Sequence, residues 1–190
     1  MAKLFATHGA KVIIADIQDE RGHSICKEFP TISYVHCDVT KESDIENAIN
    51  DVISKHGKLD IMFNNAEIIM PVQNTSALEL EKRHFEKVFD LCLELGEYGI
   101  RVNCVSPFLI STPLLGDAMG SVVAEEAVAE WVAAAANLKG TVAETDDIVE
   151  AVFFLGSDES KYMSGLNMVV DGGYSKVNLM ITMAMRGVRF

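Results

Sequence analysis

The chain has 190 residues, of which 49% are hydrophobic and 23% charged, a composition typical of globular proteins that excludes disordered, fibrous and membrane-spanning chains. Its 28 acidic and 16 basic residues give a net charge of -12, which argues against nucleic acid or an anionic membrane as a partner. The four cysteines form no Cys-x-x-Cys pair and are expected to be reduced thiols. No signal peptide is apparent and no apolar run reaches the ~18 residues of a membrane span, so a cytoplasmic protein is predicted.

Short runs rich in β-branched residues predict the strands of a parallel sheet. The first, residues 11–17 (KVIIADI), follows Gly9 and is expected to be buried on both faces, as strands in parallel sheets are. The same pattern recurs at residues 32–39, 59–64, 101–106 and 166–170.

Helices are predicted between these strands. The clearest covers residues 42–56, with apolar side chains on one face, Thr40 as its N-cap and Gly57 just past its end. Strands that alternate with helices indicate βαβ units, so we predict an α/β fold with a Rossmann-like doubly wound parallel sheet. It forms one domain over residues 1–190 with an apolar tail over 176–190. Further helices are predicted over residues 19–29, 77–95, 124–137 and 147–155, the last with Thr145 as its cap.

Polar residues end each predicted strand, where ligands of doubly wound sheets bind. Asp16 ends the first strand, and a carboxylate there can accept hydrogen bonds from both hydroxyls of an adenosine ribose. It would repel a 2'-phosphate and so favour NAD over NADP. The alternative is an aspartate that only caps a turn or helix. The next strands end in Asp38 and Val39, in Asn65, and in Ser106.

Five stretches carry a resemblance to a known family. They are residues 8–19, 37–40, 57–66, 94–107 and 162–173, and they cover nearly the whole chain in the family's order. They resemble the short-chain dehydrogenase/reductase family and, within it, the plant NAD-dependent alcohol dehydrogenases.

The resemblance implies that NAD is the cofactor and that residues at the strand ends bind it. Asp16 would bind the ribose, Asp38 and Val39 would meet the adenine, and Asn65 would close the floor of the cofactor site. Ile110 and Thr112 would hold the nicotinamide amide. The complete set of cofactor-binding residues that the resemblance implies is Asp16, Ile17, Asp38, Val39, Asn65, Ile110 and Thr112.

Two local departures should weaken cofactor binding. Glu67 and Phe108 stand where the family has glycine, which permits a positive φ and close approach of the backbone to a ligand. The family's Gly-x-x-x-Gly-x-Gly turn, whose backbone N–H groups face the pyrophosphate, has no counterpart in the sequence.

The family's catalytic residues are also missing. They are a serine, a helix asparagine and a Tyr-x-x-x-Lys pair, in which the lysine lowers the pKa of the tyrosine so that it acts as general acid and base. The chain has four tyrosines, and none is followed by lysine four positions later, so we assign no catalytic residue. These tyrosines are Tyr34, Tyr98, Tyr162 and Tyr174.

The segment that carries these catalytic residues in the family is missing between Asp90 and Leu91. Up to Asp90 the chain resembles the family's helix after the fourth strand, and from Leu91 it resembles the far end of the next helix. The strand between them is absent, as is the opening strand, which leaves about five of the family's seven strands. Residues 11–17 and 59–64 would both pair with the missing opening strand, so they must pair with each other, leave a gap or expose sheet edges.

Other candidate sites are weaker. His36 and Cys37 lie on opposite faces of a strand and cannot share a metal ion, so we predict core packing for both and no metal site. Ser106 and Ser111 lack a histidine partner and are interpreted as turn or cap residues. Trp131 is either part of a substrate lid, as the resemblance suggests, or a core residue.

The resemblance implies an oxidoreductase that oxidises a secondary alcohol of a small lipophilic plant metabolite and transfers hydride to NAD. Little or no such activity is expected of this chain. One alternative is a pseudoenzyme that docks on a full-length relative through its last strand and tail, as part of a homo- or hetero-oligomer. Another is a splice or gene-model product without an independent role.

Overall fold

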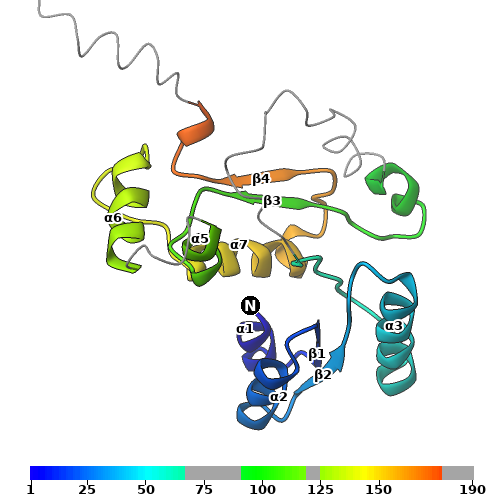
Figure 1. Ribbon diagram of the computed structural model, residues 1–190. Helices are drawn as coiled ribbons and strands as arrows, with labels where there is room; N and C mark the ends of the chain where they lie inside the picture. The colour runs from blue at the N-terminus through cyan, green and yellow to red at the C-terminus, as the bar shows by residue number, and fades with distance from the viewer. Residues whose placement is uncertain (67–90, 119–124, 177–190) are drawn as a thin grey trace, which may run out of the picture. The chain divides into compact units, whose positions relative to one another are not determined.

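The computed structural model describes residues 1–66, 91–118 and 125–176, which fall into two units, residues 1–68 and 69–190. The first unit contains, in order, α1 (Ala2–Thr7), β1 (Val12–Asp16), α2 (Asp19–Glu28), β2 (Ile32–His36) and α3 (Glu42–His56) (Figure 1). The second contains a helical segment at 91–96, β3 (Cys104–Pro107), α5 (Pro113–Ala118), α6 (Glu125–Ala135), α7 (Thr145–Gly156), η3 (Asp158–Ser160), β4 (Asn167–Val170) and η4 (Tyr174–Lys176).

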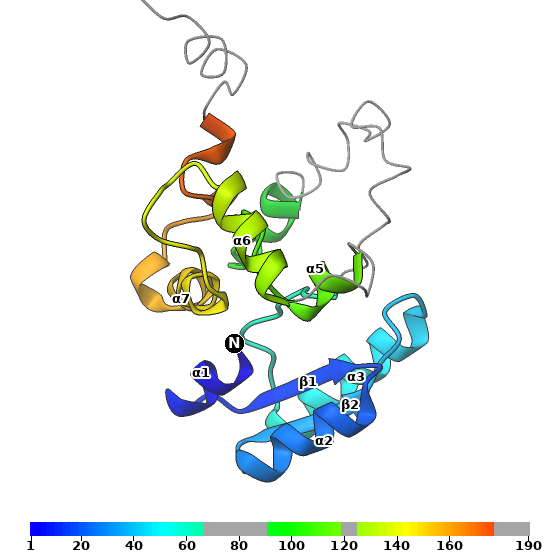
Figure 2. The same ribbon diagram turned by 60° about the vertical axis from the view of Figure 1, so that its left-hand side comes forward.

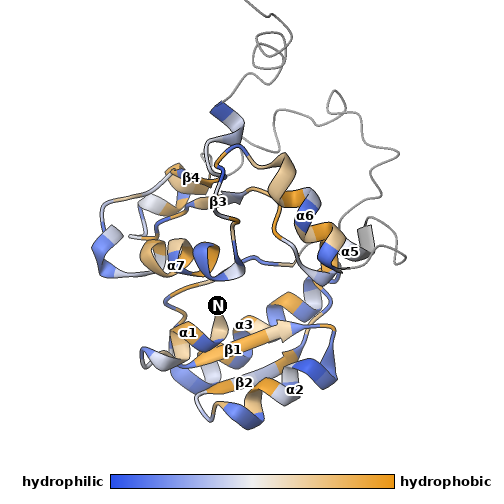
Figure 3. Ribbon diagram, turned by 90° about the vertical axis from the view of Figure 1, so that its left-hand side faces the viewer, coloured by the Kyte–Doolittle hydropathy of each residue, from blue (hydrophilic) through white to orange (hydrophobic). Residues whose placement is uncertain are grey.

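The first unit is built on a parallel pair of strands. In this pair Val12 of β1 lies opposite Ile32 of β2, and Asp16 lies opposite His36. Helix α2 packs against the pair on one side and α3 lies on the other (Figure 2). Colouring by hydropathy shows β1 as apolar over most of its length (Figure 3). The buried apolar residues of this unit are Ala6, Ile32, Cys37 and Ala48.

Helix α3 covers the predicted residues 42–56, and the start of the helix corrects one expectation. Its C-cap Gly57 has a φ of 78°, the left-handed conformation that glycine adopts most easily. Its N-cap is Lys41 and not Thr40, because the backbone N and the Oγ1 of Thr40 both donate to Asp38 Oδ1 in the preceding turn.

The remaining predicted helices form with shifted ends. Helix α7 starts at Thr145, so its N-cap is Glu144, whose backbone N donates to Asp147 Oδ2 at 2.8 Å. Helices α2 and α6 lie within the predicted ranges 19–29 and 124–137. Of the helix predicted over 77–95, residues 91–95 are helical and the rest lie outside the described residues. The predicted tail is outside them from residue 177 onward.

The second unit is built on another parallel pair, in which Cys104 of β3 lies opposite Asn167 of β4. Helix α7 packs against both strands (Figure 1). The guanidinium of Arg101 joins the approach to β3 to the end of this helix, since it donates to the carbonyls of Leu155 at 2.8 Å and Met163 at 3.2 Å. A separate apolar cluster of Leu115, Val128 and Val132 holds α5 against α6, with Phe108 packed on it.

One predicted strand is wrong. Residues 58–66 form no strand, and the apolar side chains at 59, 61, 62 and 63 are 39–55% exposed. Within the described part of the chain, β1 pairs with β2 alone. The expected burial of strands on both faces is also wrong, because Val12, Ile13 and Ile14 are only partly buried and Ala15 is exposed. A two-stranded sheet has too few neighbours to cover both faces of either strand.

The contact between Gly22 and Tyr34 generates a prediction about stability. A Cβ added at Gly22 would overlap the Tyr34 ring, whose hydroxyl is hydrogen-bonded and which therefore has little room to move. We expect Gly22→Ala to lower the free energy of unfolding by about 1–3 kcal/mol, because overpacking outweighs the ~1 kcal/mol that alanine contributes to a helix interior.

Urea unfolding followed by circular dichroism measures this effect. Ser24→Ala, at an exposed position of the same helix, is the matched control and should leave the midpoint unchanged or raise it. In a Tyr34→Ser background the loss caused by Gly22→Ala should be smaller, since the clash is absent there. Equal midpoints for the two alanine variants would contradict the prediction.

Candidate functional site

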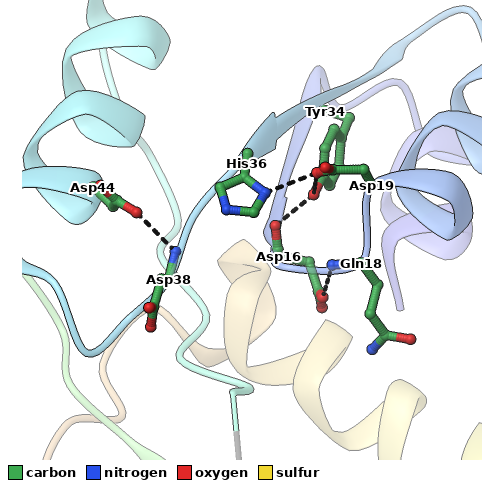
Figure 4. Close-up of polar contacts among 7 residues, drawn as sticks. All are labelled: Asp16, Gln18, Asp19, Tyr34, His36, Asp38 and Asp44. Carbon is green, nitrogen blue, oxygen red and sulfur yellow. Dashed lines mark hydrogen bonds and ion pairs between the residues drawn. The ribbon is translucent and has the colours of Figure 1, made fainter.

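The carboxyl ends of β1 and β2 bring several polar side chains of the first unit together (Figure 4). Because the strands are parallel and Asp16 lies opposite His36, the residues that follow each strand emerge at the same edge of the sheet. Asp19 begins α2 directly after β1, and Asp38 follows β2 before α3. This edge is where the sequence predicted a ligand.

Asp16 keeps one carboxylate oxygen available. Its Oδ1 accepts a hydrogen bond from the backbone N of Gln18 at 2.9 Å, which closes the turn into α2. No hydrogen bond joins its Oδ2 to any part of the chain that the structure describes. Ile17 beside it is 62% exposed. Asp16 therefore serves as a turn aspartate, as the alternative interpretation held, and its second oxygen can still accept hydroxyl donors.

Tyr34, Asp19 and His36 form a hydrogen-bonded group next to Asp16. The Tyr34 hydroxyl donates to Asp19 Oδ1 at 2.7 Å and is within hydrogen-bond distance of the backbone carbonyl of Asp16. His36 Nδ1 lies 2.8 Å from the same Asp19 oxygen. The hydrogen bonds from Tyr34 and then His36 lower the pKa of Asp19. Burial and the neighbouring Asp19 raise the pKa of Tyr34 to about 12, so Tyr34 is a hydrogen-bond donor at neutral pH and not a base.

The prediction of core packing is right for Cys37 and wrong for His36. Cys37 is 3% exposed, and its burial raises the pKa of its thiol. His36 is exposed and pairs with Asp19. The role of His36 as a partner of Asp19 differs from both roles expected from the sequence, metal ligand and core residue. The signal for this group in the sequence is that Tyr34 and His36 are two residues apart, which puts both side chains on one face of β2.

The carboxylate of Asp38 is fully engaged within its own turn. Its Oδ1 accepts from Thr40, and its Oδ2 lies 3.2 Å from Lys41 Nζ. The hydrogen bonds from Thr40, with a further contribution from Lys41, lower the pKa of Asp38 to about 2. Its backbone N donates to Asp44 Oδ2 at 3.1 Å. Asp38 thus fixes the path of the chain, and Val39 after it is 50% exposed.

The other predicted cofactor residues lie elsewhere. Asn65 is exposed in the irregular stretch 58–66. Ile110 and Thr112 belong to the second unit, where Thr112 directly precedes α5 and its Oγ1 accepts from Leu115 N at 3.4 Å. Within the first unit the structure therefore brings together Asp16, Ile17, Asp38 and Val39 at the carboxyl ends of β1 and β2.

The weaker candidates have structural roles. Ser106 Oγ donates to Asn167 Oδ1 at 2.8 Å and so links β3 to β4. Trp131 is 46% exposed, so it is not the core residue of α6 that one interpretation made it. The ring of Phe108 stacks on Tyr174, with centroids 4.6 Å apart.

Among the described residues no three His, Cys, Asp or Glu side chains gather as metal ligands, and no helix has the length and apolarity to cross a membrane.

Parallel strand pairs flanked by helices, with polar residues at their carboxyl ends, define a Rossmann-type α/β protein. The family model described as "Enoyl-(Acyl carrier protein) reductase" matches residues 1–93 and 90–175. The short chain aldehyde dehydrogenase 1 of Euphorbia lathyris is 39% identical over 240 residues, with 93% of this chain and 83% of that protein covered. The secoisolariciresinol dehydrogenase of Forsythia intermedia is 36% identical over 238 residues, with 95% and 85% covered. The chain belongs to the short-chain dehydrogenase/reductase family.

A solved structure shows the same fold. It is a short-chain dehydrogenase/reductase of unknown function from Caenorhabditis elegans, solved with cofactor, with a TM-score of 0.77 and 22% identity. The similarity covers 95% of this chain and 91% of that one.

The comparisons also locate an internal deletion. The alignments with the plant relatives extend over 240 and 238 residues, more than the 190 residues of this chain, so the relatives contain residues with no counterpart here. The family model matches in two parts that meet at residues 90–93. The boundary between these two parts agrees with the junction predicted at Asp90 and Leu91.

The engagement of Asp38 predicts an acid-sensitive contribution to stability. An aspartate has a pKa near 3.9 when unfolded, and that of Asp38 is about 2 in the folded chain. Its contribution is complete above about pH 4 and is lost as the pH falls towards 2, because the unfolded state then binds the proton more readily. We expect the urea midpoint of Asp38→Asn to depend less on pH across this window than that of the unchanged protein.

The measurement is a series of urea unfolding curves between pH 5 and pH 2.5. Glu46→Gln, at an exposed position of α3, is the control and should keep the unchanged protein's pH profile. An Asp38→Asn profile parallel to that of the unchanged protein would contradict the prediction.

Proposed function

We propose that the first unit binds the adenosine part of NAD and that this chain, by itself, does not transfer hydride. The observation that carries the proposal is the Oδ2 of Asp16, an acceptor at the end of β1 to which no described residue donates a hydrogen bond. The donor set fits this group, since a carboxylate oxygen suits ribose hydroxyls and its charge disfavours a 2'-phosphate. NAD is therefore the proposed nucleotide.

The residues around Asp16 have separate tasks in this proposal. Asp16 accepts the ribose hydroxyls, while Ile17 and Val39 offer exposed apolar surface to the adenosine. Asp38 holds the turn that carries Val39, since its own carboxylate is occupied. When bound, NAD supplies a hydride acceptor.

The absence of hydride transfer follows from the missing acid/base residues. None of the four tyrosines has a lysine four positions later, so the sequence offers no Tyr-x-x-x-Lys pair to remove the proton of an alcohol. The reaction that membership of the family implies is oxidation of a secondary alcohol of a small lipophilic plant metabolite. Ile110 and Thr112 are assigned to the nicotinamide amide, and Phe108, which stands where the family has glycine, weakens its binding.

A second candidate function is docking on a full-length relative or on another copy of the chain. Its support is the open side of β1, which has β2 as its single partner within the described residues, and the exposed apolar residues at 59–63. An unpaired strand edge of this kind favours pairing with another chain.

The four cysteines are free, which agrees with a reducing compartment, and we assign the protein to the cytoplasm.

Nucleotide titration tests the first proposal. We expect isothermal titration calorimetry to detect NAD and 5'-AMP binding, with weaker binding of NADP. Asp16→Asn should weaken AMP binding about tenfold or more, because hydrogen bonds to a charged acceptor are lost. Glu20→Gln, an exposed neighbour on α2, is the control and should bind as the unchanged protein does. No AMP binding would overturn the adenosine site, and NADH production from any alcohol would overturn the inactivity.

Co-purification with a full-length relative tests the second candidate. We expect a complex on size-exclusion chromatography that the double variant Ile61→Ser/Phe63→Ser abolishes, because the contact would bury these apolar side chains. Leu93→Ser, an exposed apolar residue of the second unit, should leave the complex intact. An unchanged complex with the double variant would exclude this surface.

A further inference from the structure

The turn that carries Asp16 is tied to the neighbouring strand. Residues 16–19 link β1 to α2, and Tyr34 reaches this turn from the middle of β2. Its hydroxyl lies within hydrogen-bond distance of two acceptors in the turn, the backbone carbonyl of Asp16 and the Oδ1 of Asp19 (Figure 4). One side chain of β2 therefore contacts both ends of the turn.

Packing holds the Tyr34 ring in place. The ring lies over Gly22 of α2, where a larger residue would clash with it. The ring of His23 meets it edge to face, with centroids 4.9 Å apart and planes at 85°. The position of the hydroxyl is thus set by the fit of the ring and not by the hydrogen bonds alone.

Asp19 is held by a second side chain. His36 Nδ1 lies 2.8 Å from the Asp19 oxygen that accepts from Tyr34. Tyr34 and His36 are two residues apart on β2, so both reach the start of α2 from one face of the strand. We call Tyr34, Asp19 and His36 the Tyr34 clamp.

The clamp leaves Asp16 with little freedom. Its carbonyl is near the Tyr34 hydroxyl, and its Oδ1 accepts from Gln18 N at 2.9 Å. With these two groups fixed, the direction of Oδ2 is fixed as well. We propose that Tyr34 is a positioning residue that, through the clamp, holds the Asp16 carboxylate in the orientation that binds the adenosine ribose. This rests on the proposed function of the first unit.

A purely structural role of Tyr34 makes a different prediction. If Tyr34 only stabilised the fold, its loss would weaken every ligand of the first unit alike. If it orients Asp16, its loss affects only ligands that use Asp16, which are those with ribose hydroxyls. A nucleotide without these hydroxyls therefore separates the two roles.

The experiment compares 5'-AMP with 2',3'-dideoxy-AMP by calorimetry. Tyr34→Phe keeps the ring over Gly22 and removes the hydroxyl. We expect it to weaken AMP binding about three- to tenfold, the effect of one hydrogen bond, and to change dideoxy-AMP binding less than about twofold. In the presence of Asp16→Asn, Tyr34→Phe should have no further effect on AMP. Tyr98→Phe, an exposed tyrosine of the second unit, is the control.

Amide exchange measured by NMR supplies a readout that needs no nucleotide. The Gln18 amide, which donates to Asp16 Oδ1, should exchange faster in Tyr34→Phe than in the unchanged protein. Circular dichroism and urea unfolding check that the variant folds. If it does not, Asp19→Asn, which keeps one acceptor oxygen, takes its place and should act in the same direction.

Each outcome bears on one of the two proposals. Equal weakening of AMP and dideoxy-AMP, or unchanged binding of both, overturns the positioning role of Tyr34. If the unchanged protein does not bind AMP, the proposed function is overturned, and so is the role of Tyr34 in ribose binding. Faster exchange of the Gln18 amide in Tyr34→Phe would then still support the clamp as a constraint on the turn, and unchanged exchange would overturn that too.

Discussion

The parallel pairing of β1 with β2 is the constraint on which the rest of the first unit depends. It places Asp16 opposite His36 and so directs the turns after both strands to one edge of the sheet. A two-stranded sheet is only marginally stable in water without other elements packed on it. The helices on both sides and the Tyr34 clamp therefore contribute to keeping the pair, and the pair in turn keeps the strand ends adjacent.

Within the described residues, the first unit lacks strand pairings that a complete doubly wound sheet would have. A central strand provides hydrogen-bond partners on both of its sides, and its removal leaves neighbouring backbone without a ladder. β1 has one partner within the described residues, and residues 58–66 have no regular structure. In the second unit Arg101 links separate segments of the chain. Its guanidinium donates to the carbonyl of Leu155 near the end of α7 and to that of Met163 after this helix.

The sequence predicts best what depends on local chemistry. Helix α3 was found from its apolar spacing and Gly57, and Asp16 was found from its place after an apolar run. Residues 59–64 have the composition of a strand, but a strand exists only with a partner, which composition does not reveal. The Tyr34 clamp was missed for a related reason, since it joins two elements through side chains that each look ordinary in isolation.

The two aspartates at the strand ends differ in whether a carboxylate oxygen is left for an outside donor. Asp38 has both oxygens engaged by its own turn, whereas Asp16 retains one oxygen for an outside donor. The residues that orient Asp16 all come from residues 16–36, a single βαβ unit that does not include the deletion. The proposed loss of acid/base catalysis instead concerns the Tyr-x-x-x-Lys pair, which the sequence does not contain. A site built within one short stretch of sequence can therefore persist where a site assembled from distant elements is lost.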